Sequence, residues 1–438
     1  AWQLLFHLKV KEHNFKEIEA FLKEHPKFPF KNNLLRELEL IHLTLIPYAK
    51  DDSFGFIDTT GKYVISPVYD DVKAFHEELA VVNVNDSLFY IDKDNVRYIN
   101  QTFSEAYSFY KGIAGVKKEN KWFLIDRLGN KHSDFFDDMN ELSEEKYIVK
   151  NNNLFGCINQ HGDYIIPCEL EKMGDFKNSA AYYTKDGKYG FIHIQNNYTA
   201  PALFDWLSNF DEKGIAVFKM NNRFGLINSK GQKLCDANYD QLLRISDSLY
   251  LAVVNNKYGF ISHSGCEILA VEYDYNPLIP ITEYEGNGYL LCIIDEKKFF
   301  KSHDGLSFFQ KHKFDDIYVP AEQLVLVQKK NKYGFVNLNG DKVIPTQYLS
   351  AEKFIKGTAI VETEEGFTLI DRLGNKLIPE TAEIKRFNEN LLFISGEKDE
   401  LIDKTGKILQ NNIKSYEVYK PYLLLELEKG EIKVIRFE

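Results

Sequence analysis

The chain has 438 residues and carries 65 acidic side chains against 54 basic ones, which gives a net charge of −11. This balance argues against broad electrostatic binding to nucleic acid or anionic lipid. No apolar stretch reaches the ~20 residues that a membrane-spanning helix needs. Tyr (26) and Phe (33) are abundant whereas Met (3) is scarce, a composition that favours strands over helices.

The first fifty residues have a helical pattern. The first helix is marked by apolar side chains at helical spacing, namely Leu4, Leu5, Leu8, Phe15, Ile18, Phe21 and Leu22. Pro26 and Pro29 interrupt it, and a second helix ending near Pro47 would place Leu34, Leu38, Ile41 and Leu45 on one face. We therefore expect residues 1–50 to form an αα-hairpin. It would cap the first edge strand of the remaining chain, dock a partner, or be the remainder of a longer helical domain.

From residue 54 onward the chain repeats one phrase, which is clearest as VVNNKYGFISHSG at residues 253–265. Each copy has an anchor residue, usually aromatic, followed in the best copies by Gly, two hydrophobic residues and a polar one. The eleven anchors are Phe54, Leu88, Trp122, Phe155, Tyr189, Phe224, Tyr258, Lys298, Tyr333, Phe367 and Asp399. They lie 32 to 40 residues apart, with a period near 34. Self-similarity at a fixed period indicates a repeat architecture.

The columns of the repeat predict a small antiparallel meander of three or four strands. A polar pair such as Asn221-Asn222 predicts a hairpin turn before the anchor strand. Seven residues after the anchor, a residue that tolerates positive φ predicts a second tight turn. This turn column holds Gly61, Asn95, Gly129, Gly162, Asn196, Gly231, Gly265, Gly305, Gly340, Gly374 and Gly406. Such units cannot bury their own apolar faces, so they must stack on one another.

Two further columns come after the tight turn. A Pro is expected to end the next strand because it cannot donate to the ladder, and this column holds Pro67, Pro167, Pro201, Pro345 and Pro379. An aromatic–Asp pair comes next, as in Tyr239-Asp240, and we expect it to form another strand or an ordered loop. A short apolar strand such as Ala359-Ile360-Val361 then leads into the next hairpin turn.

These columns resemble the WG repeat family of bacterial proteins, in which an aromatic–Gly–Phe–Ile phrase, a turn Gly, an Ile-Pro and a Tyr-Asp recur. The resemblance covers the chain from about Phe54 onward. It departs from the name-giving dipeptide, because the only anchor Trp, Trp122, is followed by Phe123. The resemblance implies a module that mediates interactions, often as an accessory part, and it implies no catalytic constellation that could be carried over.

We expect an all-β, propeller-like array of short antiparallel meanders, with a β-solenoid as the alternative. Eleven copies exceed the ~4–8 blades of common propellers, so one ring, two rings and an open array all stay open. The longest interval contains the Pro-rich stretch from Asn276 to Pro280. The predicted domains are therefore residues 1–50 (helical hairpin), 51–275 (repeats one to seven) and 276–438 (repeats eight to eleven).

No nucleotide-binding, zinc-protease or serine-hydrolase motif occurs in the chain. His161, His263 and His303 fall at the tight turn of their repeats, so they would either line one rim and bind a metal or be solvated turn residues. The run Asp92-Lys93-Asp94-Asn95 hints at a calcium turn but lacks the rest of a loop motif, so it too is interpreted as a turn.

Two recurrent features have both a structural and a functional interpretation. The pairs Asp70-Asp71, Asp137-Asp138 and Asp315-Asp316 could supply acid–base chemistry, but we expect turns in which the carboxylate accepts nearby backbone N–H groups. The phrase Ile-Asp-Arg-Leu-Gly-Asn-Lys occurs at residues 125–131 and 370–376. It indicates a duplication or the family consensus, or else a partner contact made twice, by Arg127 and Arg372.

The five cysteines, Cys157, Cys168, Cys235, Cys266 and Cys292, have irregular spacing that matches no disulfide framework or metal knuckle. We expect them to be small core residues, which favours a reducing, cytoplasmic compartment. No signal peptide is visible, but the chain lacks an initiator Met, which leaves export of a processed protein open.

The sequence therefore predicts a non-enzymatic scaffold that binds another protein, alone or as an accessory subunit of a larger bacterial assembly. The expected partner is a protein or a multi-subunit complex, with no nucleic acid and no direct membrane insertion. A glycan or small-ligand binding module is the alternative. We predict no catalytic residue, cofactor or metal, and the repeat pattern does not identify the binding residues.

Overall fold

The computed structural model describes residues 5, 9–10, 15–31, 35, 40, 43–195, 198–286, 288–302, 306–396 and 398–437. These residues contain eleven small antiparallel sheets that follow one another along the chain. The chain divides into two compact units. Unit 1 comprises Ala1–Gly214, Val418–Leu424 and Ile432–Arg436, and unit 2 comprises Ile215–Glu417, Leu425–Glu431 and Phe437–Glu438. The predicted domain division at residue 276 stays a prediction.

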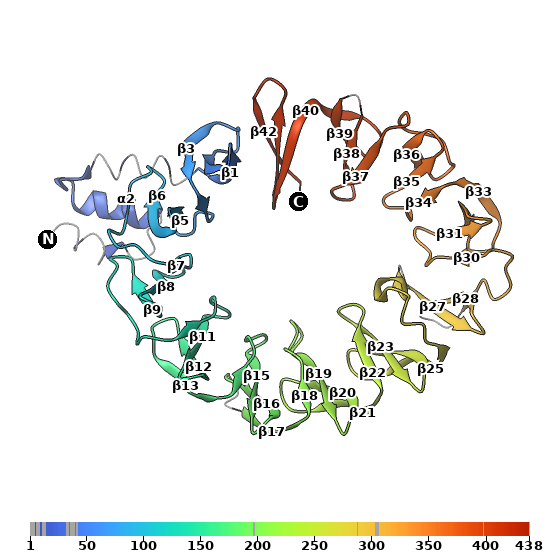
Figure 1. Cartoon of the computed structure of the whole chain (residues 1–438), viewed down its shortest axis with the longest axis horizontal. Coiled ribbons are helices and arrows are strands. Elements are labelled where there is room, and N and C mark those ends of the chain that lie inside the picture. The colour runs from blue at the N-terminus through green and yellow to red at the C-terminus, as the bar shows by residue number, and fades with distance from the viewer. Residues whose placement is uncertain are drawn as a thin grey trace. The chain divides into compact units, whose positions relative to one another are not determined.

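Unit 1 contains five sheets whose strands pair in chain order (Figure 1). They are β1–β3 (Ile46–Lys50, Ser53–Ile57, Tyr63–Tyr69), β4–β6 (Asp71–Val72, Leu79–Val84, Ser87–Asp92), β7–β9 (Glu105–Ala106, Ile113–Lys118, Lys121–Asp126), β10–β13 (Asp138–Met139, Lys146–Asn151, Leu154–Asn159, Tyr164–Leu170) and β14–β17 (Lys172–Met173, Ala180–Lys185, Lys188–His193, Tyr198–Phe204). The short strand β18 (Trp206–Leu207) follows. Strands β41 (Tyr422–Leu427) and β42 (Ile432–Arg436) also contribute to this unit.

Unit 2 continues the same pattern. Its strands are β19–β21 (Ile215–Met220, Arg223–Asn228, Lys233–Tyr239), β22–β25 (Gln241–Arg244, Leu249–Val254, Lys257–Ser262, Glu267–Asp274), β26–β29 (Glu285–Gly286, Tyr289–Ile294, Lys297–Ser302, Ser307–Phe308), β30–β33 (Asp316–Ile317, Leu324–Lys329, Lys332–Asn337, Lys342–Tyr348), β34–β36 (Ser350–Ala351, Thr358–Thr363, Gly366–Asp371) and β37–β40 (Glu383–Arg386, Leu391–Ser395, Asp399–Asp403, Ile408–Tyr419). A short 3-10 helix, η1 (Ile281–Glu283), precedes β26.

The propeller-like fold is confirmed, and the β-solenoid alternative is not. Within the described residues, each sheet is a meander in which consecutive strands pair in the antiparallel sense, as β10, β11 and β12 do. Side chains from successive sheets then form the core between them. Trp122 and Leu124 on β9, for example, pack with Tyr147 and Val149 on β11. Burying each such side chain contributes roughly 1.5–3 kcal/mol, so stacking supplies what a single meander lacks.

The predicted turns are confirmed by backbone geometry. Asn221 and Asn222 both have positive φ, of 51° and 64°, as a two-residue turn between twisted strands requires. In the tight-turn column Asn95 has φ 62° and the described glycines have φ between 79° and 87°. The two remaining members of that column, Asn196 and Gly305, lie outside the described residues.

The Gly of the repeated phrase allows the last strand of the sheet to approach closely. A Cβ at this Gly would lie 2.4–2.8 Å from a carbonyl oxygen of that strand. The copies concerned are Gly55, Gly156, Gly190, Gly225, Gly259 and Gly334, and each has a last strand of seven or eight residues (β3, β13, β17, β21, β25 and β33). A larger side chain at this position therefore has to displace the last strand.

The copies without this Gly behave as that argument requires. Phe89, Phe123 and Thr368 stand at the position, and their last segments keep only isolated bridges, such as Trp122↔Phe136 and Ile125↔Lys131. In the eighth copy Phe299 takes the place of Gly, and β29 is only two residues long. The eleventh copy is an exception, since Glu400 lies opposite the long strand β40.

The expectation that Pro ends a strand is wrong for four of the five prolines. Pro67, Pro167, Pro201 and Pro345 lie inside the last strands β3, β13, β17 and β33. The physical reason is that the last strand is an edge strand with a register shift opposite the repeat Gly, so it tolerates a residue without a backbone donor.

The N-terminal segment is described in part. Helix α2 (Phe15–Glu24) confirms the later part of the first predicted helix, and Ile18, Phe21 and Leu22 are buried on one face with Val10. Leu5 is also helical, whereas Leu4 and Leu8 lie outside the described residues. The structure describes no helix there that is long and apolar enough to cross a membrane.

Most of the second predicted helix, including Leu34, Leu38 and Ile41, also lies outside the described residues. Two residues within it, Leu35 and Leu40, are helical. The predicted helix end near Pro47 is wrong, because Leu43 and Leu45 are not helical and Pro47 lies in strand β1, where it pairs with β2. Lys93, a buried lysine of the second repeat, contacts this segment, and its Nζ donates to the carbonyl oxygens of Leu40 (3.3 Å) and Leu43 (3.0 Å).

The C-terminal segments of unit 1 pack against its first sheet. Leu424 and Ile432 are buried in one cluster with Ile46, Tyr48 and Ile57. The approach is close, because a Cβ at the turn residue Gly61 would lie 2.1 Å from the carbonyl oxygen of Ile432. The β1–β3 sheet, which begins the array, therefore has a covered face.

Candidate functional site

The recurrent aspartates hold hairpin turns. In each pair the first carboxylate accepts the backbone N–H of a turn fifteen residues later, as Asp70 does from Asn85 (2.6 Å) and Asp315 from Lys330 (2.6 Å). The second carboxylate accepts the next backbone N–H, as Asp71 does from Val72 (2.9 Å). The turn interpretation is therefore confirmed, although the first Asp reaches much further along the chain than a local turn would.

Aspartates at the first position also form ion pairs with lysines, as Asp137 and Asp274 do. The hydrogen bond from Lys121 lowers the pKa of Asp137 below its ordinary 3.8, and Lys257 acts in the same way on Asp274. The backbone contacts of this pair match those of the other two pairs. Asp137 accepts the backbone N–H of Asn152 (2.7 Å), and Asp138 accepts that of Met139 (3.0 Å). Carboxylates held ionised in this manner are poor general acids at neutral pH.

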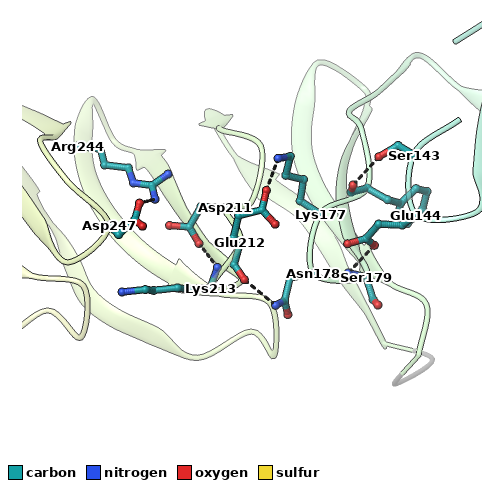
Figure 2. A network of polar contacts seen from close by, with 11 residues as sticks. Ser143, Glu144, Lys177, Asn178, Ser179, Asp211, Glu212, Lys213, Arg244 and Asp247 are labelled. Carbon is teal, nitrogen blue, oxygen red and sulfur yellow. Dashed lines mark hydrogen bonds and ion pairs between the residues drawn. The ribbon is translucent and has the colours of Figure 1, made fainter. Parts of the chain in front are cut away.

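A second set of polar contacts links hairpin turns of successive sheets (Figure 2). In unit 1 the Glu144 carboxylate accepts the backbone N–H of Ser179 (2.9 Å), and Lys177 forms an ion pair with Glu212. Asn178 Nδ2 also donates to the carbonyl oxygen of Glu212 (3.1 Å). In unit 2 Glu322 bonds Gly357 N–H (2.9 Å), and the Arg244–Asp247 pair lies within its own turn. These charges stabilise the array, and we assign none of them to a site.

The two Arg-Leu-Gly phrases have a structural role. Arg127 Nη1 donates to the carbonyl oxygen of Glu77 (2.8 Å), and Arg372 Nη2 donates to that of Glu322 (2.5 Å). Both carbonyls belong to hairpin turns fifty residues earlier. Arg127 is buried, with its guanidinium 5.4 Å from the ring centre of Tyr98. A partner contact made by both arginines is therefore wrong for Arg127, which a partner cannot reach.

The histidines of the turn column are not gathered into a metal centre among the described residues. His161 is exposed and His263 is half-buried, while His303 lies outside the described residues. Among the described residues, no group of three or more His, Cys, Asp or Glu side chains is placed to hold a metal ion. Asp92 Oδ1 accepts the backbone N–H groups of Asp94 (3.0 Å) and Val96 (2.9 Å), which confirms a turn at that position.

All five cysteines are free, and two of them are buried core residues, as predicted. Burial raises the pKa of the Cys157 thiol to about 12, and it does the same for Cys292. Cys168 and Cys235 are half-buried. The prediction of a core position is wrong for Cys266, which is exposed because it directly follows the tight turn of its repeat.

Exposed aromatic side chains gather in unit 1. The last strands β3, β13 and β17 each begin with a tyrosine, and Tyr63, Tyr164 and Tyr198 are 38%, 45% and 37% exposed. The same position in unit 2 is charged in β21, β25 and β33, where the residues are Lys233, Glu267 and Lys342. Unit 1 adds exposed Phe135, Leu203 and Trp206. Phe135, Tyr164, Tyr198, Leu203 and Trp206 come from several parts of unit 1, and we refer to this set of exposed residues as the unit 1 aromatic surface.

The eighth repeat contains the second candidate site. Its shortened strand β29 is followed by residues 309–314, which line a cavity of 480 Å³ together with Lys329 and residues 338–340. The sequence pattern gave no binding residues here. The available signal was the irregular copy itself, in which Lys298 replaces the aromatic anchor and Lys311-His312-Lys313 replaces the usual Pro-containing segment.

Fold and contacts together define an all-β repeat protein whose recurrent residues build the scaffold. The family described as WG containing repeat matches residues 54–87, 99–122, 155–189, 189–224, 224–258 and 333–366. The chain is therefore a WG repeat protein, as the aromatic–Gly and turn-Gly columns indicated. Within the repeats, the match leaves out residues 88–98, 123–154, 259–332 and 367–438, and the eighth repeat lies in the third of these stretches.

Three solved structures that match this chain share little sequence with it. A crystal structure of a eukaryotic initiation factor is 14% identical over 68% of this chain and 94% of its own, with a TM-score of 0.32. Hsv2p of Kluyveromyces lactis is 7% identical over 52% of this chain and 92% of its own, with a TM-score of 0.25.

An extracellular domain assigned to a one component system of B. thetaiotaomicron is 10% identical over 90% of this chain and 70% of its own, with a TM-score of 0.23. At this similarity none of the three carries an argument about function. Comparison with curated proteins finds no match.

Proposed function

We propose that this protein is a non-enzymatic scaffold that binds another protein, as an accessory subunit of a larger assembly. The observation that supports the proposal is the unit 1 aromatic surface. Tyr and Trp are enriched at protein interfaces, because they bury large areas with little loss of side-chain entropy and keep a polar end. Solvated tyrosines at equivalent strand positions, as in Tyr164 and Tyr198, provide such anchors on a rigid sheet.

The internal use of the charged residues supports the same proposal. The recurrent aspartates hold turns, and the glutamates and lysines of Figure 2 link one sheet to the next. Arg127 and Arg372 hold turn carbonyls. The exposed residues that differ between repeats are then the ones available to a partner, and in unit 1 they include aromatic and apolar side chains as well as polar ones.

The test is affinity capture from an extract of the native host with the tagged chain. The double variant Tyr164→Ser with Tyr198→Ser removes two anchors, and loss of one interface aromatic weakens binding by roughly 2 kcal/mol or more. We expect the wild-type chain to retain a stoichiometric partner and the double variant to lose it. The matched control is Lys233→Ser with Glu267→Ser, which changes the same strand position in unit 2 and should retain the partner. Capture of no partner, or equal loss in both variants, would contradict the proposal.

A glycan-binding module is the second candidate, and one observation favours it. Trp206 is 39% exposed, and exposed Trp rings are suited to stacking on sugar faces. A glycan array probed with the wild-type chain and with Trp206→Ala separates the two candidates. Binding to a defined glycan that Trp206→Ala abolishes supports this second function, and an array without hits removes it.

A further inference from the structure

The eighth repeat has lost the strand that closes its neighbours. Where β33 runs for seven residues, β29 runs for two, because Phe299 occupies the position of the repeat Gly. The chain from Phe309 to Phe314 leaves the sheet instead. The cavity of 480 Å³ beside it falls within the range of small-molecule sites, which is roughly 300–1,000 Å³.

Side-chain contacts hold this departing segment in one shape. His312 Nε2 lies 3.0 Å from the carbonyl oxygen of Lys298, and a carbonyl can only accept, so Nε2 carries the proton. Nδ1 then accepts the backbone N–H of Phe314 (3.3 Å), whose ring is nearly parallel to the imidazole. Phe309 is held at φ 61°, a conformation that costs an aromatic residue free energy. A shape fixed in this way lowers the entropy cost of binding.

The cavity is basic although the chain is acidic. Lys311, Lys313 and Lys329 line it with His312, and no acidic side chain lines it among the described residues. No ion pair between described residues involves any of these three lysines, all of which are exposed. Three ammonium groups at one hollow repel each other, and an anion would relieve that repulsion.

The first cavity lies between the eighth and ninth repeats, and a second cavity at the equivalent position between the second and third repeats provides a contrast. Lys118 ends strand β8 as Lys329 ends β31, and Gly129 is the tight-turn counterpart of Gly340. This smaller cavity of 290 Å³ is also lined by Lys131, but it is lined by Glu119 as well, whose negative charge offsets part of the positive charge of the two lysines. The two sites share a place in the repeat and differ in charge.

We propose that the cavity of the eighth repeat binds a small phosphorylated ligand, a phosphate monoester with an aromatic or heterocyclic group. Ammonium groups on flexible stems suit the compact, doubly charged phosphate, which three lysines can surround. The rings of Phe309 and Phe314 supply the apolar side of the lining for the remainder of the molecule. This site is independent of the unit 1 aromatic surface, so either proposal can fail alone.

The experiment is isothermal titration of the full chain at low salt with adenosine monophosphate, inorganic phosphate, adenosine and hexaglutamate. We expect saturable binding of adenosine monophosphate, weaker binding of phosphate, and none of adenosine. Lys311→Gln with Lys313→Gln, and separately Lys329→Gln, should each weaken binding by roughly tenfold or more, because each removes charge-assisted contacts. The matched control Lys118→Gln with Lys131→Gln should bind as the wild type does.

Four results would overturn the proposal. They are absence of saturable binding by both phosphate compounds, adenosine binding as tightly as its monophosphate, equal loss in the control variant, and binding of hexaglutamate alone, which would indicate an acidic protein segment. Because the substituted lysines are exposed, their removal should leave thermal unfolding unchanged, and a circular dichroism melt of each variant verifies this. Stronger binding of phosphate than of the nucleotide would also contradict the aromatic part of the proposal.

Discussion

The substitution Gly259→Ala tests why the repeat carries Gly after its anchor. The added Cβ would lie 2.5 Å from the carbonyl oxygens of both Leu269 and Ala270 on β25. Real carbon–oxygen contacts are longer, so β25 must move by roughly 0.5–1 Å. That movement breaks the pairing of Phe260 with Leu269, one of the two register pairs that flank the Gly.

The magnitude follows from these contacts. One or two backbone hydrogen bonds contribute about 1 kcal/mol each, and the steric misfit of an overpacked site costs about 1–3 kcal/mol. Together they lower the free energy of opening β25 by roughly 2–5 kcal/mol. Amide exchange in this strand should therefore accelerate by about 30-fold to 4,000-fold, since each 1.4 kcal/mol is a factor of ten.

The assay is hydrogen exchange followed by mass spectrometry, read on peptides covering residues 267–274. The control is Gly187→Ala, at a turn where a Cβ meets no atom within 4 Å, although its φ of 71° adds a local cost. Exchange in β25 should stay unchanged in the control. Unchanged exchange of β25 in Gly259→Ala itself would refute the explanation of the repeat Gly.

Three shorter predictions concern the same scaffold. Tyr258→Phe should lower the melting temperature, at a cost of about 1–2 kcal/mol, because the buried hydroxyl bonds a backbone carbonyl at 2.6 Å; an unchanged melt would contradict this. Lys257 lowers the pKa of Asp274, so the stability it adds is present above pH 3.8 and lost as the pH falls through the lower folded value; acid unfolding of Asp274→Asn should depend less on pH. Maleimide should label Cys266 at neutral pH before Cys157, whose pKa is about 12, and mass spectrometry gives the order.

The repeated parts of the fold could be predicted from the sequence because their causes are local. A residue in the tight-turn column needs positive φ whatever surrounds it, so Gly231 and Asn95 indicate a turn from their identity alone. Hairpin pairs such as Asn255-Asn256 follow the same rule. The repetition then implies stacking, because a lone meander leaves an apolar face in water.

Non-local contacts could not be predicted. The position of Pro67 inside β3 depends on a register shift opposite Gly55, which involves two strands at once. The role of Arg127 depends on a carbonyl fifty residues away, and the sequence shows only that the phrase occurs twice. The exposure of Cys266 follows from its place directly after a turn, which hydrophobicity alone does not reveal.

The candidate sites lie where the repeat pattern is broken or variable. The cavity of the eighth repeat exists because Phe299 displaces the last strand, so an irregular copy marks it although no motif does. The tyrosines Tyr164 and Tyr198 begin their strands at a position that holds Lys or Glu in other copies. The repeat pattern alone does not identify such positions as binding residues. Their exposure in the structure does.

The central claim is that unit 1 binds a protein partner through its aromatic surface. The most direct measurement is a hydrogen-exchange footprint of the chain in complex with the partner captured from the host. We predict that the partner protects peptides containing β13 (Tyr164–Leu170) and β17 (Tyr198–Phe204), while β21 and β25 exchange as in the free chain. Protection confined to β21 and β25, or no protection of any strand, would contradict the account.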